Sequence, residues 1–141
     1  MQPLATVDIT RPWHWGIAIL SDPDLGGEIP EVDPSGGVSA NEKGVIVAVR
    51  HAQDIESFEG DFEWAEATVT VRLWSDPPKL EEGCVVAFEG RLATPSGQLW
   101  IGDADENSVA EGFPTSTSIR VVLLSHDLDS PDQVWVDAWE A

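Results

Sequence analysis

The sequence predicts an all-β fold, a mostly antiparallel β-sandwich of seven or eight strands with little helix. Short runs of alternating apolar and polar residues recur along the chain, and clusters of glycine and proline separate them. No stretch longer than about ten residues keeps the 3.6-residue apolar period of an amphipathic helix. With 141 residues, 42% of them hydrophobic, the chain can build the core of a single domain covering residues 1–141.

The clearest predicted strand spans residues 67–74. Val69, Val71 and Leu73 share one face of it, because every second side chain of a strand points to the same side. Valine and threonine alternate here, and both suit a half-buried, pleated surface. The other predicted strands are residues 7–10, 15–20, 44–50, 84–92, 98–102, 119–125 and 134–139.

Turn-forming residues connect these strands. Thr94-Pro95-Ser96-Gly97 predicts a hairpin turn between the strands at 84–92 and 98–102. Residues 21–43 are rich in Asp, Glu, Pro and Gly and have few apolar anchors, so we expect a long, mobile acidic loop there. The best helix candidate, residues 52–62, is short and acidic and is predicted to form one turn or a loop.

The chain carries 26 acidic and 7 basic residues, a formal charge of −19. The charge is spread evenly: residues 1–70 hold 13 acids and 3 bases, and residues 71–141 hold 13 acids and 4 bases. So negative a surface excludes general binding to nucleic acids and anionic membranes, which both require positive charge. Two explanations remain, namely solubility or adaptation to a salty cytoplasm, and a cationic protein partner.

Cysteine usage and the N-terminal sequence predict a cytoplasmic protein. Cys84 is the single cysteine, so no intramolecular disulfide can form, as expected in a reducing cytosol. No basic segment followed by a long apolar stretch marks a secretory signal at the N-terminus. The longest apolar run, residues 15–20, is far shorter than the ~20 residues that span a bilayer.

A strip at residues 54–66 combines carboxylates with aromatic rings and contains no basic residue. Such a surface suits a basic protein groove, including one that normally holds DNA or RNA, since charge speeds the encounter and aromatics supply contact energy. Alternatively, it is a solvated connection whose aromatics anchor it to the core. The candidate partner-binding residues are Asp54, Glu56, Phe58, Glu59, Asp61, Phe62, Glu63, Trp64 and Glu66.

Seven tryptophans and no tyrosine form the aromatic set, together with four phenylalanines. Alternation places Trp74, Trp135 and Trp139 on the outer face of their strands. An outer aromatic row is covered by a loop or helix, buried in a homodimer interface, or open to stack on a ligand ring such as a sugar.

A second ligand candidate follows the strand at 98–102. Asp103, Asp105 and Asn107 stand at relative positions 1, 3 and 5 of a calcium loop, a spacing that aims oxygen ligands at one cation. The glycine and glutamate of the later positions are missing, although Glu111 could act as a ligand in a different loop geometry. The alternative is a solvated acidic turn, and no other cofactor is indicated.

No pattern in the chain points to catalysis. His14, His51 and His126 are scattered and lack the spacing of a metal site. Cys84 lies within a predicted strand rather than at a helix N-terminus or beside a cation, so nothing marks it as an activated nucleophile. The sequence therefore predicts a non-enzymatic protein.

The pattern resembles the competence protein J group of small acidic bacterial proteins, which includes an inhibitor of a DNA-uptake nuclease. The similarity rests on the strand at 67–73, the segment Pro95–Ile101, the glycine turn and strand at 112–124, and a tryptophan within residues 134–141. The resemblance implies an acidic β-sandwich that binds and blocks a basic protein. It transfers no catalytic residue.

Together these observations predict a non-enzymatic acidic binding protein that inhibits or sequesters a basic protein such as a nuclease or toxin. The alternative is a ligand-binding β-sandwich module for calcium or carbohydrate.

Overall fold

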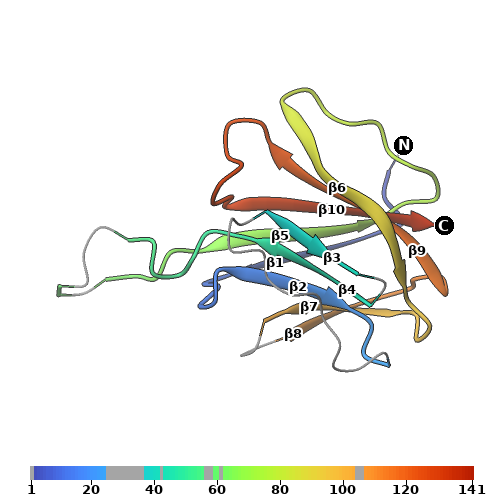
Figure 1. The fold of residues 1–141 in the computed structure, drawn as a ribbon, viewed down its shortest axis with the longest axis horizontal. Coiled ribbons are helices and arrows are strands. Elements are labelled where there is room, and N and C mark those ends of the chain that lie inside the picture. The colour runs from blue at the N-terminus through green and yellow to red at the C-terminus, as the bar shows by residue number, and fades with distance from the viewer. Residues whose placement is uncertain (1, 25–36, 42, 56–58, 61, 104–106) are drawn as a thin grey trace.

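Ten strands form two five-stranded sheets in the computed structural model, and the sheets pack face to face (Figure 1). The structure describes residues 2–24, 37–41, 43–55, 59–60, 62–103 and 107–141. The predicted all-β, mostly antiparallel fold is confirmed. In the described part of the chain, no helix is long and apolar enough to cross a membrane.

The first sheet has the order β1-β5-β10-β9-β6. Its neighbours are antiparallel except β5 and β10, which run parallel at the centre of the sheet. A parallel pair needs a long crossover, and the chain between these two strands provides one, because it forms β6 to β9 on the way. The strands are β1 (Ala5–Arg11), β5 (Ala67–Leu73), β10 (Gln133–Glu140), β9 (Ser116–Leu124) and β6 (Cys84–Ala93).

The second sheet is antiparallel throughout, in the order β3-β4-β2-β7-β8. Two of its strands, β3 and β8, are absent from the sequence prediction. β3 lies within residues 21–43, where we expected a mobile loop; residues 25–36 of that loop lie outside the described residues. The strands are β3 (Val38–Ala40), β4 (Gly44–Ala48), β2 (Ile17–Ser21), β7 (Gln98–Gly102) and β8 (Asn107–Glu111).

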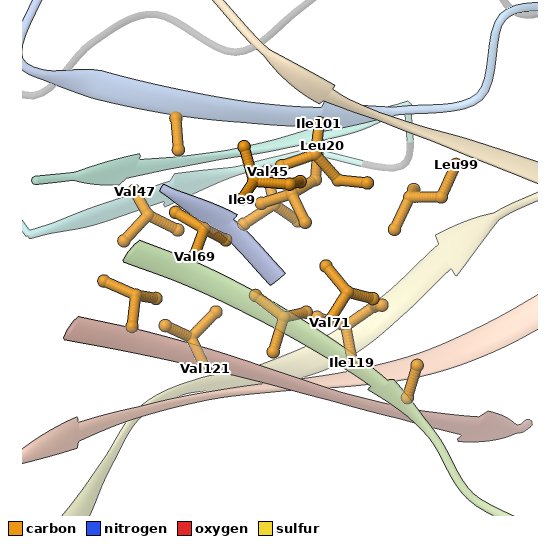
Figure 2. Close-up of a cluster of buried hydrophobic side chains, with 14 of the residues drawn as sticks. Ile9, Leu20, Val45, Val47, Val69, Val71, Leu99, Ile101, Ile119 and Val121 are labelled. Atoms are coloured by element: carbon orange, nitrogen blue, oxygen red, sulfur yellow. The ribbon is translucent and has the colours of Figure 1, made fainter. Parts of the chain in front are cut away.

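The core fills the space between the two sheets, as Figure 2 shows. Alternate residues of β5 are buried, which confirms the face predicted for Val69 and Val71. Val136 lies directly between Val71 and Val121 on the neighbouring strands, so one apolar row crosses the centre of the first sheet. Each such buried aliphatic side chain contributes about 1.5–3 kcal/mol to the stability.

The outer face of the first sheet carries a row of alternating charges. Strand register aligns Arg72, Asp137, Arg120 and Glu89 on four neighbouring strands. Arg72 donates to both oxygens of Asp137, from Nε at 2.7 Å and Nη2 at 3.1 Å. Opposite charges on facing residues stabilise a sheet, so the row supports this strand order.

Residues 75–83, here called the strap, connect β5 to β6 and lie across this outer face. The Pro78 carbonyl accepts a hydrogen bond from Nη1 of Arg120 at 2.8 Å. Leu80 and Glu81 of the strap line a small pocket with Trp135 and Asp137. The strap thus makes part of the outer face a second, smaller buried layer.

Candidate partner-binding surface

The connection from β4 to β5, residues 49–66, contains the predicted acidic and aromatic strip and is here called the arm. Its described parts run out from the sandwich at the left of Figure 1. The two sides of its base are joined by a hydrogen bond from Ala65 N to Ala52 O at 2.9 Å. Both alanines are buried, so the arm leaves the sandwich from a packed base.

Trp13 anchors this base. Its ring is fully buried, and its Nε1 donates to the carbonyl of Ala67 at 2.9 Å. Its own carbonyl accepts hydrogen bonds from Gly16 N and Ala52 N, both at 3.0 Å. Trp13 therefore ties together the β1–β2 turn, the arm and the start of β5.

Among the glycines near this base, Gly16 is expected to tolerate substitution by alanine least. It has φ of 67°, and a Cβ added there would lie 2.9 Å from Cδ2 of His51. We expect Gly16→Ala to lower the free energy of unfolding by about 2 kcal/mol or more, because a left-handed alanine costs about 1–2 kcal/mol before any clash. Urea unfolding followed by tryptophan fluorescence measures this difference.

Gly83→Ala is the matched control. Gly83 also has a positive φ of 83°, but nothing lies within 4 Å of its added Cβ. Its loss of stability should therefore reflect backbone strain alone and be smaller. Equal losses in the two variants would contradict the close packing of His51 on Gly16.

Exposed aromatic rings gather where the arm meets the β1–β2 turn. Trp64 makes edge-to-face contacts with Phe62, at 5.1 Å between ring centroids, and with His14, at 5.4 Å. Trp64 and Phe62 are 38% and 39% exposed, and Trp15, next to His14, is 58% exposed. Three large apolar side chains therefore reach solvent on and beside the arm.

Carboxylates occur along the arm before, between and after these rings in the sequence. Asp54, Glu59, Glu63 and Glu66 are all exposed. Arg50 provides a counter-charge at the base, with its Nε 3.4 Å from Oδ2 of Asp54. The other predicted partner-binding residues, Glu56, Phe58 and Asp61, lie outside the described residues.

The predicted ligand-stacking tryptophans lie on the outer face of the first sheet, as alternation indicated. Trp74 and Trp139 are nevertheless buried, and Trp135 is half-buried. Nε1 of Trp74 donates to Oδ1 of Asp137 at 2.8 Å. Stacking on a sugar needs an open ring face, so the stacking prediction is corrected for Trp74 and Trp139. Their burial agrees instead with the alternative in which a loop covers the aromatic row, and the strap is the loop that lies beside them.

The structure describes three of the four residues predicted to bind calcium. The side chain of Asp103 is fully buried, and its Oδ1 lies 3.0 Å from Nη2 of Arg11. Asn107 and Glu111 begin and end β8, which pairs with β7, and Asp105 lies outside the described residues. No group of three or more His, Cys, Asp or Glu residues suited to a metal occurs among the described residues.

Sequence reasoning missed two parts of this arrangement. It considered His14 only as one of three scattered histidines, whereas the fold brings His14 against Trp64 of the arm. It also missed the contact of Asp137 with Arg72 and Trp74. The alternation of residues 67–74 and 134–139 contained a signal for the second contact, but only the pairing of β5 with β10 brings these side chains together.

The fold has counterparts among solved structures. No protein-family model matches the chain, and no curated protein matches its sequence. The crystal structure of ComJ from Bacillus subtilis, described as an inhibitor of the DNA-degrading activity of NucA, superposes with a TM-score of 0.57 at 12% identity, covering 99% of this chain and 98% of that one. A structure described as crocagin biosynthetic gene J gives a TM-score of 0.59 at 13% identity, covering 96% of both chains. The resemblance to competence protein J is thereby confirmed for the fold.

Proposed function

We propose that this protein binds a basic protein through the arm and so inhibits or sequesters it, as an inhibitor of a nuclease or a toxin does. The observation that carries the proposal is the pair of exposed, contacting rings Phe62 and Trp64 on an arm that bears exposed carboxylates, together with the exposed Trp15, whose sequence neighbour His14 contacts Trp64. This group projects from the sandwich on a base fixed by Trp13 and Ala52. It is therefore accessible and held in place.

In this binding, charge governs the association rate and the aromatic contact area supplies the short-range binding energy. A chain of charge −19 attracts a basic protein over long range, which raises the association rate and weakens as salt is added. Aromatic side chains supply short-range energy, because they bury large areas and lose little conformational entropy. The arm combines the two, with Glu63 between Phe62 and Trp64 in the sequence.

The structural comparison supports the class of partner. ComJ, which shares the fold over almost its whole length, is described as an inhibitor of a DNA-degrading protein. A nuclease has a positively charged groove for its substrate, and an acidic arm with exposed rings complements such a groove. The partner proposed for this chain is therefore a basic nuclease.

A pull-down followed by an activity assay tests the function. The immobilised chain is exposed to extract of its source organism at about 50 mM and 500 mM salt, where screening differs strongly. A basic protein retained only at low salt is then purified and assayed for DNA degradation with increasing amounts of the chain. We expect activity to fall to a plateau near one equivalent; retention of no basic protein, or full activity at excess, would overturn the proposal.

Removing the rings of the arm should abolish tight binding. We expect Phe62→Ala combined with Trp64→Ala to weaken the affinity for the captured partner by about 1,000-fold, since central aromatic contacts each contribute about 2 kcal/mol, or about 4 kcal/mol together. Trp100→Ala is the matched control, because Trp100 is also 38% exposed but lies on β7 of the second sheet. Calorimetric titration measures both, and equal losses would contradict the assignment of the arm.

A further inference from the structure

A groove of about 380 Å³ lies on the outer face of the first sheet, beside the strap. Pro77 of the strap forms one side, Trp139 lines it, and Glu89, Arg91, Ser118 and Arg120 also contribute. The volume falls within the range of about 300–1,000 Å³ that is typical of small-molecule sites. The groove is separate from the residues of the arm.

Positive charge is concentrated around this face. Of the seven basic residues in the chain, Arg91 and Arg120 line the groove, and Arg72 and Lys79 line the smaller pocket of the same face. In a chain of charge −19, four of seven cations therefore share one sheet face with the three carboxylates of Glu81, Glu89 and Asp137, which line the same two pockets and leave a net charge of +1, located at the groove. Their position favours an anionic ligand here, in contrast to the arm.

Arg120 is held in a defined position. Its guanidinium stacks over the ring of Trp139 at 4.9 Å and donates to the carbonyl of Pro78. Glu89 lies 3.5 Å from its Nε, and within the described part of the chain this nitrogen makes no hydrogen bond. The positive charge of Arg120 is therefore compensated by the nearby carboxylate of Glu89 without a hydrogen bond at Nε.

Arg91 supplies the second cation. It is exposed, it faces Ser118 across β6 and β9, and no described residue forms an ion pair with it within 4 Å. Two guanidinium groups and the carboxylate of Glu89 leave the groove a formal charge of +1. One singly charged anion would balance it.

We propose that this groove binds a small organic monocarboxylate. The carboxylate would meet Arg91 and Arg120, since guanidinium groups bind carboxylates through paired, charge-assisted hydrogen bonds. The hydroxyl of Ser118 offers a further donor, and Pro77, which is exposed, offers apolar surface to the body of the acid. A phosphate dianion is disfavoured by Glu89 and by the negative charge of the whole chain. This inference does not depend on the proposed role of the arm.

An NMR titration of the ¹⁵N-labelled chain with benzoate tests the proposal. We expect saturable shifts of the backbone signals of Arg91 and Ser118 and of the indole signal of Trp139. Benzamide, which has the same shape without the charge, should cause none, and inorganic phosphate should bind at least tenfold more weakly. Equal shifts with benzamide, tighter binding of phosphate, or no saturable shift would each overturn the proposal.

Two charge-matched variants locate the site. Arg91→Gln should weaken benzoate binding at least tenfold. Lys79→Gln removes the same charge from an exposed residue of the strap that lines the neighbouring pocket, and it should change the affinity less than twofold. Equal effects of the two substitutions would show that net charge alone governs binding, and would overturn the assignment of the groove.

Discussion

Replacing Asp137 with alanine is expected to destabilise the protein by about 3 kcal/mol, at the lower end of the cost of breaking a buried ion pair, because the carboxylate is buried while the Arg72 side chain is 22% exposed. Asp137 is 3% exposed, and its carboxylate accepts hydrogen bonds from Arg72 and from Nε1 of Trp74. The substitution leaves both donors unsatisfied beside the strap. A loss of this size is a large fraction of the total stability of a small domain, about 5–15 kcal/mol.

Urea unfolding monitored by circular dichroism and by tryptophan fluorescence measures this loss. Asp8→Ala is the control, because Asp8 also accepts a hydrogen bond, from Thr70 at 2.7 Å, but is exposed. It should cost less than about 1 kcal/mol, as is usual for exposed pairs. Adding Arg72→Met to Asp137→Ala should restore part of the stability, since no half-buried cation then lacks a partner. A loss below 1 kcal/mol for Asp137→Ala would contradict the network.

The second large effect is expected at Asp103. Its fully buried side chain pairs with Arg11, which itself stacks over Trp13 at 4.2 Å. Arg11 ends β1 of the first sheet and Asp103 follows β7 of the second, so this ion pair links the two sheets. We expect Asp103→Ala to lower the free energy of unfolding by about 3 kcal/mol, because it leaves the largely buried Arg11 guanidinium, whose side chain is 13% exposed, without this carboxylate.

The variant Asp103→Ala also tells whether Asp103 pairs with Arg11 or binds calcium. If Asp103 only forms the ion pair with Arg11, addition of calcium or EDTA leaves the melting temperature of the unmodified chain unchanged. Glu111→Gln, which alters an exposed residue at the end of β8, should have little effect under either condition. A rise in melting temperature with calcium that disappears in Asp103→Ala would instead support the calcium site and contradict our assignment.

Most strands were predictable because their signals are local. β7 was predicted with its observed bounds, and β5 ends one residue earlier than expected. β3 was missed because three residues cannot display an alternating pattern. β8 was missed because its first residue, Asn107, completes an Asp-x-Asp-x-Asn spacing that also occurs in calcium loops. Short strands of a sheet edge are selected by their neighbours rather than by their own sequence.

The arm could be predicted only in part. Composition alone identified the acids and rings of residues 54–66, and the described ones are exposed. The contribution of His14 and Trp15 depends on Trp13, which holds the β1–β2 turn against Ala52 through backbone hydrogen bonds. The groove beside the strap was not predictable, since Arg91, Arg120 and Trp139 come from three strands whose order is a property of the whole fold.

The central position of β10 determines the order in which the protein can be completed during synthesis. β1 can pair with β5 once β2 to β4 have been made, and β6 can pair with β9 once β7 and β8 have been made, but the two halves of the first sheet meet only through β10. Residues 133–140 must therefore leave the ribosome before the sheet can close. Until then, the inward valines of the two halves cannot form the continuous apolar row that crosses the finished sheet.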